Sequence, residues 1–310
     1  MSAYWPYSLD LDLDEFGLVE ESRTAAFGLL KTVRSRERTS ATCTLLLHGV
    51  ASSWRTWAPL VKEGRRRGQA LGDVVMVDLP GFGTSDNRLP HLDMATLGAE
   101  LFALTAAFGY ERINLVGHSM GGFLALDMAS RPSAGRDRVA SLGLAAAAYF
   151  SVVRAAQGHR SFELRTVVPS AVVWSQRLLA AHQTINRMGT TVMLRPAVAR
   201  AVLSPFIAHP ARVNDSTMRL LVRESRPESF VLAARNALGY QPREQWRTIT
   251  VPVRAVFGAR DRLIPAGDVR EFLEVLPDCD SVVVRGASHM VHMERPGDSF
   301  AALFPEQEII

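Results

Sequence analysis

The segment 113–122, INLVGHSMGG, constrains the fold of this 310-residue chain more than any other part of the sequence. An apolar run leads into Gly-His-Ser-Met-Gly, and a helix-favouring run, residues 123–129, follows it. The pattern predicts a strand, one sharp turn at Ser119 and then a helix. Gly117 and Gly121 fit this arrangement, because the strand and helix backbones approach too closely there for a Cβ atom. A Gly-x-Ser-x-Gly motif in that setting is typical of a nucleophilic serine whose hydroxyl stands clear of the sheet edge.

The same motif also occurs as a plain glycine-rich turn without chemistry, and the flanking strand and helix are what favour the nucleophile. With these flanks the chain resembles the α/β-hydrolase family, in its small, lidded, esterase-like branch. The resemblance implies fold class α/β, with a mostly parallel, doubly wound sheet and an inserted helical lid. It also implies a catalytic triad whose members follow in the order serine, acid, histidine.

Strand-like and helix-like segments alternate along the rest of the chain, which predicts a parallel sheet with helices on both faces. Ligands gather at the carboxyl ends of the strands in such sheets. Residues 1–20 are irregular and form either an edge strand or an arm on the body, and residues 23–35 alternate as a strand. Further strands are expected at 41–47, 74–77, 139–144, 251–257 and 281–284, and helices at 53–64, 94–108, 265–276 and 296–304.

The alternating pattern stops between residues 150 and 246, where apolar, helix-like segments are interrupted by prolines. We expect this region to form a helical lid between two parts of the core, residues 1–149 and 247–310. Its apolar residues exceed what packing among a few helices needs. They either line a pocket for a hydrophobic acyl or ring group or seal the lid onto the body. Helices are expected at 167–181, 192–206 and 228–238.

A serine hydroxyl is a weak nucleophile at neutral pH and needs a base that an acid holds in place. Asp261 follows an expected strand in Gly-Ala-Arg-Asp, and His289 follows the next strand in Gly-Ala-Ser-His. These segments resemble the family's Gly-x-x-Asp and Gly-x-x-His, and they occur in the required order. The resemblance implies that Ser119, His289 and Asp261 form the catalytic triad.

Other acids and histidines compete for these roles. His292 lies three residues beyond His289 and is the alternative base, although we expect it in the following turn or helix. Residues 144–149, where some family members carry the acid, contain no carboxylate. Surface roles or packing in the lid suffice for the remaining candidates: Asp268, Asp278, Asp280, His91, His159, His182 and His209.

The oxyanion of an acyl-transfer intermediate needs two hydrogen-bond donors. The Met120 amide, at the start of the expected helix, is one. The family's His-Gly loop implies the amide of Val50, which follows His48-Gly49, as the other, with His48 bracing the loop. The turn of residues 78–85, DLPGFGTS, is expected to act as scaffold. The expected substrate-binding residues are Trp54, Tyr149 and Met290.

Composition bears on several other classes of protein. The formal net charge is +4, and the tight basic run at residues 65–67 lacks interleaved aromatics, which favours a solvated loop over a nucleic-acid surface. Cys43 and Cys279 lack metal-like spacing and predict free thiols in a reducing compartment. No metal, nucleotide or other cofactor motif is visible, no apolar run reaches membrane-spanning length, and residues 1–20 lack a signal-peptide pattern. We expect a cytoplasmic protein without a cofactor, either a monomer or a homo-oligomer.

The expected activity is hydrolysis of an ester or thioester of a hydrophobic small molecule through an acyl-enzyme. C–C bond hydrolysis, acyl transfer to another acceptor and perhydrolysis stay open, because fold and triad do not fix the substrate. Serine at the turn argues against dehalogenases and epoxide hydrolases, which form an ester on aspartate. Residues 50–54, VASSW, differ from the Gly-Pro-Gly stretch of ring-fission C–C hydrolases. A non-catalytic ligand-binding protein is the third class, although such proteins often lose a triad member.

Overall fold

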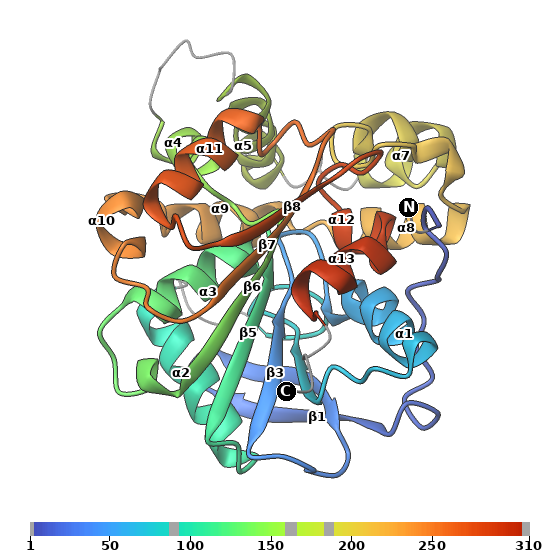
Figure 1. Cartoon of the computed structure of the whole chain (residues 1–310). Coiled ribbons are helices and arrows are strands. Elements are labelled where there is room, and N and C mark those ends of the chain that lie inside the picture. The colour runs from blue at the N-terminus through green and yellow to red at the C-terminus, as the bar shows by residue number, and fades with distance from the viewer. Residues whose placement is uncertain (1–2, 87–92, 159–165, 183–188, 306–310) are drawn as a thin grey trace.

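The computed structural model describes residues 3–86, 93–158, 166–182 and 189–305 of the chain. These residues form a sheet of eight strands in the order β1-β2-β4-β3-β5-β6-β7-β8 (Figure 1). Neighbouring strands along the sheet from β4 to β8 are parallel, and β2 is antiparallel to both β1 and β4. The expected mostly parallel sheet is confirmed. The strands are β1 (Leu18–Ala25), β2 (Gly28–Ser35), β3 (Thr42–Leu47), β4 (Asp73–Val77), β5 (Arg112–His118), β6 (Val139–Ala145), β7 (Val253–Gly258) and β8 (Asp280–Val284).

The hairpin of β1 and β2 corrects the expectation of one strand over residues 23–35. Ala25 pairs with Gly28, so the chain reverses at residues 26–27. Gly28 has φ 111°, a conformation that favours glycine. The turn itself is Ala-Phe, without Pro, Asn or Asp, so the alternation of the sequence runs through it unbroken.

Helices cover both faces of the sheet, and a second group lies between β6 and β7 in the chain (Figure 1). The helices of the body are α1 (Ala58–Arg67), α2 (Met94–Ala107), α3 (Met120–Ser130), α11 (Ala266–Val275), α12 (Val291–Glu294) and α13 (Pro296–Leu303). The second group, called the inserted helices below, comprises α4 (Phe150–Gln157), α5 (Val167–Ala181), α7 (Pro196–Leu203), α8 (Asp215–Arg223), α9 (Pro227–Arg235) and α10 (Pro242–Trp246). Short 3₁₀ turns occur at η1 (Trp54–Trp57), η2 (Arg136–Arg138) and η4 (Pro210–Arg212).

The sheet separates two hydrophobic clusters, because side chains point alternately to its two faces. On β3, Leu45 and Leu47 belong to the cluster that includes residues of α2 and α3, whereas Leu46 belongs to the cluster of α1 and α13. Trp57 and Phe300, both fully buried, pack into the second cluster. This two-sided packing fixes the carboxyl ends of the central strands relative to one another.

The inserted helices lie across one end of the sheet, at the top of Figure 1. The expected helix at 167–181 coincides with α5, whereas α7 is shorter than the expected segment 192–206 because it begins with Pro196 in its first turn. The helix α10 differs from the others. Its Trp246 is fully buried and packs edge-on against Phe123 of α3, within the core.

The N-terminal residues contain both an edge strand and an arm, the two structures that were open alternatives for residues 1–20. Leu18 begins the edge strand β1, and residues 3–17 precede it as an arm. Tyr4, Trp5 and Leu9 of this arm are buried in a cluster with residues of α7 and α8. The arm therefore joins the inserted helices to the body.

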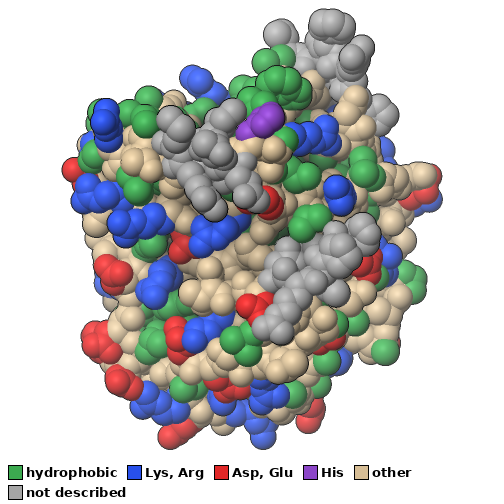
Figure 2. All heavy atoms as spheres, turned by 180° about the vertical axis from the view of Figure 1, so that it is seen from behind, with side chains coloured by type: hydrophobic (Ala, Val, Ile, Leu, Met, Phe, Trp, Pro, Cys, Tyr) green, Lys and Arg blue, Asp and Glu red, His purple; other side chains and the backbone are tan. Residues whose placement is uncertain are grey.

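The basic run at residues 65–67 forms the last turn of α1, which corrects the expectation of a solvated loop. Arg66 and Arg67 pair with the buried Glu63, and Arg65 pairs with Glu15. Positive charges at a helix carboxyl end also complement the helix dipole. On the face shown in Figure 2, basic and acidic side chains are interspersed.

Three expectations about composition can be compared with the described residues. Cys43 and Cys279 are free thiols, as predicted. None of the helices in the described ranges combines the length and the apolar character that crossing a membrane requires. Within the same ranges, His, Cys, Asp and Glu side chains form no group of three or more that could hold a metal ion.

Candidate active site

Ser119 stands in a strained turn between β5 and α3, as the sequence predicted. Its backbone has φ 51° and ψ −117°, a combination that residues other than glycine rarely adopt. A Cβ atom on Gly117 would lie 2.3 Å from the carbonyl oxygen of Gly121, and one on Gly121 would lie 2.1 Å from that of Leu47. Glycine is therefore required on both sides of Ser119, and the turn presents Ser119 to a cavity.

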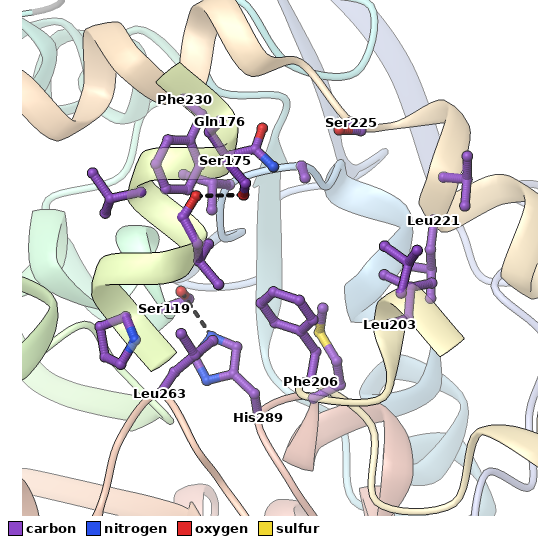
Figure 3. Close-up of a pocket in the computed structure, with 18 of the residues that line it drawn as sticks. Ser119, Ser175, Gln176, Leu203, Phe206, Leu221, Ser225, Phe230, Leu263 and His289 are labelled. Atoms are coloured by element: carbon purple, nitrogen blue, oxygen red, sulfur yellow. Dashed lines mark hydrogen bonds between the residues drawn. The ribbon is translucent and has the colours of Figure 1, made fainter. Parts of the chain in front are cut away.

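The structure brings Ser119, His289 and Asp261 into one hydrogen-bonded line. Ser119 Oγ lies 2.9 Å from His289 Nε2 (Figure 3), and His289 Nδ1 lies 2.9 Å from Asp261 Oδ2. All three residues are buried. An ionised carboxylate only accepts hydrogen bonds, so Nδ1 carries the proton and Nε2 is left to accept from the Ser119 hydroxyl. This tautomer is the one that a general base requires.

Neighbouring groups hold the acid and the base in place. Asp261 Oδ1 accepts hydrogen bonds from the amides of Leu263 and Ile264 at 2.8 and 3.0 Å. His118 Nε2 donates to the carbonyl oxygen of His289 at 3.0 Å. The role of His118 was not predicted from the sequence, although its place directly before Ser119 in the motif could have indicated it. The two amides limit rotation of the Asp261 carboxylate, and the bond from His118 holds the backbone of His289.

Val50 and Met120 border the same cavity as Ser119. Met120 is the first residue of α3, where backbone amides have no partner within the helix. Neither the Val50 nor the Met120 amide donates to another described residue. Both amides are therefore available to an atom bound beside Ser119.

His48 braces the loop that precedes Val50. Its Nδ1 donates to the carbonyl oxygen of Gly49 at 2.6 Å, and its Nε2 accepts from the Leu79 amide at 2.9 Å. Burial lowers the pKa of His48, which keeps the ring neutral and able to accept. Both ring nitrogens are occupied, so the contacts of His48 are structural.

Two cavities meet at Ser119. The larger one, with a volume of about 260 Å³, is lined by His289 and by mostly apolar side chains of α5, α7 and α8 (Figure 3). The smaller one has a volume of about 70 Å³ and lies against α3, α4 and α9. Five residues border both cavities: Val50, Ser119, Val152, Val173 and Phe230.

The three expected substrate-binding residues differ in their positions. Met290 lines the larger cavity, whereas Trp54 and Tyr149 line neither of the two. Trp54 is buried in the core, and its amide donates to Asp78 Oδ1 at 2.8 Å, in the turn expected to act as scaffold. Tyr149 is fully buried, with its ring centroid 4.4 Å from that of Phe272. The structure therefore places Trp54, in η1, and Tyr149, just before α4, in the core rather than in the lining of the two cavities.

Glu294 joins three parts of the molecule beside His289. Its Oε1 accepts from the Ser288 amide at 2.9 Å, and its Oε2 accepts from the Ala208 amide at 2.7 Å and the Tyr4 hydroxyl at 2.9 Å. Burial raises the pKa of this carboxyl group. The contacts tie the N-terminal arm and the loop after α7 to the His289 loop. Glu294 was not predicted from the sequence. Its position as an acidic residue directly after the apolar Met293, just before α13, could have indicated a buried carboxylate.

The other candidate acids and histidines lie elsewhere. Asp268 accepts hydrogen bonds from the amide and hydroxyl of Ser151 in α4. The ring of His209 packs edge-on against Tyr4. Three candidates are exposed: Asp278, Asp280 and His182. Two lie outside the described residues: His91 and His159.

His292, the alternative base, is fully buried between two rings. Its centroid lies 4.3 Å from that of His118 and 4.8 Å from that of Trp57. Neither of its nitrogens has a hydrogen-bond partner among the described residues. Burial, with a smaller contribution from His289, lowers the pKa of His292 to about 3. Burial also lowers the pKa of His118 well below its usual value, so both rings are neutral near pH 7.

Replacing His292 with leucine is expected to make folding less sensitive to acid. An unfolded histidine titrates near pH 6.5, whereas the folded ring stays neutral until about pH 3. The parent protein therefore loses stability as the pH falls through this window, by about 1.4 kcal/mol per pH unit for each such histidine. Urea unfolding at about pH 4, 5 and 6 measures the slope of the unfolding free energy against pH. In the variant this slope should be smaller by the contribution of one bound proton. Equal slopes in parent and variant would contradict a neutral, buried His292.

The model of the alpha/beta hydrolase family matches residues 44–303 of the chain. The chain is 28% identical to the dihydrolipoyllysine-residue acetyltransferase component of an acetoin cleaving system from Pseudomonas putida, over 81% of this chain and 59% of that protein. It is 26% identical to epoxide hydrolase 3 of Xenopus tropicalis, over 81% of this chain and 67% of that protein. It is 30% identical to a pimeloyl-(acyl-carrier protein) methyl ester esterase of Chromobacterium violaceum, over 74% of this chain and 82% of that protein.

The names of these three relatives describe different chemistry, so the similarity identifies a family rather than a reaction. The matched segment includes Ser119, Asp261 and His289, and it runs from within β3 through the whole of strands β4 to β8. Taken with the strand order and the turn at Ser119, the match shows that the chain belongs to the alpha/beta hydrolase family.

Proposed function

We propose that the chain is a serine hydrolase that cleaves an ester or thioester of a hydrophobic small molecule through an acyl-enzyme on Ser119. The observation that carries the proposal is the 2.9 Å distance between Ser119 Oγ and His289 Nε2, in line with the 2.9 Å distance between His289 Nδ1 and Asp261 Oδ2. A serine paired with an oriented histidine is the arrangement that activates a hydroxyl. The apolar lining of both cavities supports a hydrophobic substrate.

In the first half of the proposed reaction, Ser119 Oγ attacks the carbonyl carbon while His289 Nε2 takes the hydroxyl proton. The Asp261 carboxylate stabilises the imidazolium that forms. The amides of Val50 and Met120 donate to the oxyanion of the tetrahedral intermediate. Its collapse breaks the bond to the leaving oxygen or sulfur, which receives the proton from His289 Nε2.

The second half of the reaction hydrolyses the ester on Ser119. A water molecule attacks the acyl carbon and gives a proton to His289 Nε2. The new tetrahedral intermediate collapses, the carboxylic acid leaves, and Ser119 Oγ recovers its proton from His289. The same two amides serve both intermediates, since the oxyanion forms at the same place.

In this proposal residues 150–246 act as a lid over the core formed by residues 1–149 and 247–310. The larger cavity is lined by α5, α7 and α8 on one side and by Ser119 and His289 on the other. Apolar walls around the triad exclude water and strengthen the charge interactions within it. The cytoplasmic location and the choice between monomer and homo-oligomer stay predictions from the sequence.

A fluorophosphonate probe tests the proposed nucleophile. We expect the intact mass of the protein to rise by one adduct and peptide mapping to place the adduct on Ser119, because the activated hydroxyl attacks phosphorus as it attacks a carbonyl. The Ser119→Ala variant should stay unlabelled. Replacing the exposed Ser204 with alanine provides the matched control and should leave labelling intact. A folded parent protein that takes up no adduct would overturn the proposal.

A further inference from the structure

We infer that the substrate combines a short acyl group with a bulky hydrophobic alcohol or thiol, an assignment that rests on the proposed function. The two cavities at Ser119 have volumes of about 70 and 260 Å³. An apolar cavity of about 150 Å³ holds one benzene molecule, so the small cavity has room for about three carbon atoms and the larger one for about ten. The two ends of the substrate are therefore unequal in size.

The small cavity is lined by apolar side chains, many of them alanines. Phe123 of α3 and Val153 of α4 border it, and among its described lining residues Ser119 carries the one hydroxyl group. A polar or charged group placed there would lose its hydration without gaining partners. The cavity therefore suits a short alkyl chain. The remaining walls are formed largely by alanines, namely Ala148, Ala156, Ala233, Ala234 and Ala237.

His289 decides which end of the ester enters which cavity. The leaving oxygen or sulfur must come within hydrogen-bond distance of His289 Nε2, since it takes its proton from that atom. His289 lines the larger cavity and is absent from the described lining of the small one. The leaving group therefore extends into the larger cavity. The acyl chain, on the other side of the carbonyl carbon, is left with the small cavity.

The proposed oxyanion donors agree with this orientation. Val50 borders both cavities, whereas Met120 borders the small one. A carbonyl oxygen between their amides places the carbonyl carbon at the junction, above Ser119 Oγ. The acyl chain then continues along α3 and the leaving group along the inserted helices.

The larger cavity is suited to a hydrophobic leaving group. Leu203, Phe206, Leu221 and Leu263 line it (Figure 3). Its few polar side chains include Gln176 of α5, which lies away from Ser119 and His289 in the view of Figure 3. Apolar alcohols or thiols are therefore the class of leaving group that fits, with a polar atom tolerated at the far end.

Two series of esters test the assignment with the protein as it exists. The first holds p-nitrophenol constant and lengthens the acyl chain from acetyl to decanoyl. We expect kcat/KM to fall by at least about tenfold between butyryl and octanoyl, because the longer chain exceeds the small cavity. The second holds acetate constant and lengthens the alcohol from ethanol to decanol. Here kcat/KM should rise, by up to about fourfold for each methylene group buried.

Three variants locate the size limit. Ala233→Leu shrinks the small cavity and should raise the acetyl-to-butyryl ratio of kcat/KM by about tenfold or more. Val153→Ala enlarges the same cavity and should move the fall in the acyl series to longer chains. Leu203→Ala is the matched truncation in the larger cavity. It should change the alcohol series and leave the shape of the acyl series as in the parent.

The outcomes separate this inference from the proposed function. A protein that is labelled on Ser119 but prefers long acyl chains, or hydrolyses none of these esters, overturns the inference alone. An acyl series that responds to Leu203→Ala and not to Ala233→Leu or Val153→Ala does the same. A protein that is neither labelled nor active overturns the proposed nucleophile as well.

Discussion

Replacing His289 with alanine is expected to lower kcat/KM for ester hydrolysis by about 10⁴-fold or more. The Ser119 hydroxyl has its base at 2.9 Å in the parent protein, and without it the proton has no acceptor as the bond to carbon forms. The loss should fall mainly on kcat, since the other side chains that line the two cavities are unchanged. Steady-state kinetics on p-nitrophenyl acetate measure it, and labelling of Ser119 by the fluorophosphonate should slow in parallel.

His292→Leu is the matched control for His289→Ala. Both histidines are buried, but the ring nitrogens of His292 make no hydrogen bond to a described residue, and its ring packs against His118 and Trp57. We expect this variant to keep most of the parent's kcat/KM. Asp261→Asn should lose activity by a factor similar to His289→Ala, because the amide favours the wrong tautomer of the base. If His292→Leu were the inactive variant and His289→Ala the active one, the assignment of the base would be wrong.

Replacing Gly121 with alanine is expected to cost at least about 3 kcal/mol of unfolding free energy, a large share of the roughly 5–15 kcal/mol of a typical domain. The added Cβ atom would lie 2.1 Å from the carbonyl oxygen of Leu47 and 2.6 Å from that of His48. Both obstacles are backbone atoms at the end of β3, so no side-chain rotation relieves the clash. The helix α3 must move away from the sheet, which also displaces Ser119. Urea unfolding of parent and variant measures the loss.

Gly189→Ala provides the contrast for Gly121→Ala. Gly189 lies in a helical turn, and a Cβ atom there would meet nothing within 4 Å. Alanine should stabilise this position by about 0.5–1 kcal/mol, because glycine has the greater conformational freedom to lose on folding. A Gly121→Ala variant as stable and as active as the parent would show that strand and helix can separate at the turn without consequence.

The space above Ser119 is the part of the molecule in which differences in substrate between members of this family are expected to arise. Members of this family share a sheet and differ in what stands above the nucleophile. Here that space consists of two cavities of unequal volume, and Val173 and Phe230 are among the residues that border both. Esters of short acids with large alcohols fit these two cavities in the inferred orientation, and esters of long acids with small alcohols do not.

Most of the fold could be predicted from the sequence, because the signals are local. The β5–α3 turn needs glycine at two fixed positions around Ser119, and short apolar runs separated by helix-like segments mark the strands from β3 to β8. The hairpin of β1 and β2 could not be placed, since its Ala-Phe turn contains no turn-forming residue. The regular alternation on both sides of that turn also occurs in a single long strand.

In the candidate site, too, some residues could be predicted from the sequence and others could not. Ser119, Asp261 and His289 follow strand ends in short motifs, and parallel strands bring such ends to one edge of the sheet. Glu294 was missed because its three partners come from the N-terminal arm, the loop after α7 and the His289 loop. Trp54 follows the His48-Gly49 loop and Tyr149 follows β6, but both side chains are buried in the core, which their positions in the sequence do not reveal.

The amino-acid sequence by itself determined the sheet, the strained turn and the order of the three residues that meet there. The turn depends on steric limits within a few consecutive residues, the sheet on the alternation of strand-like and helix-like segments, and the order of the three residues on motifs that resemble those of the family. Only the tertiary structure decided the size and division of the space above Ser119. That space is bounded by side chains from several helices, among them α3, α4, α5 and α9. Its volume depends on how these helices pack against the sheet and against one another, and no short segment of the sequence specifies that packing.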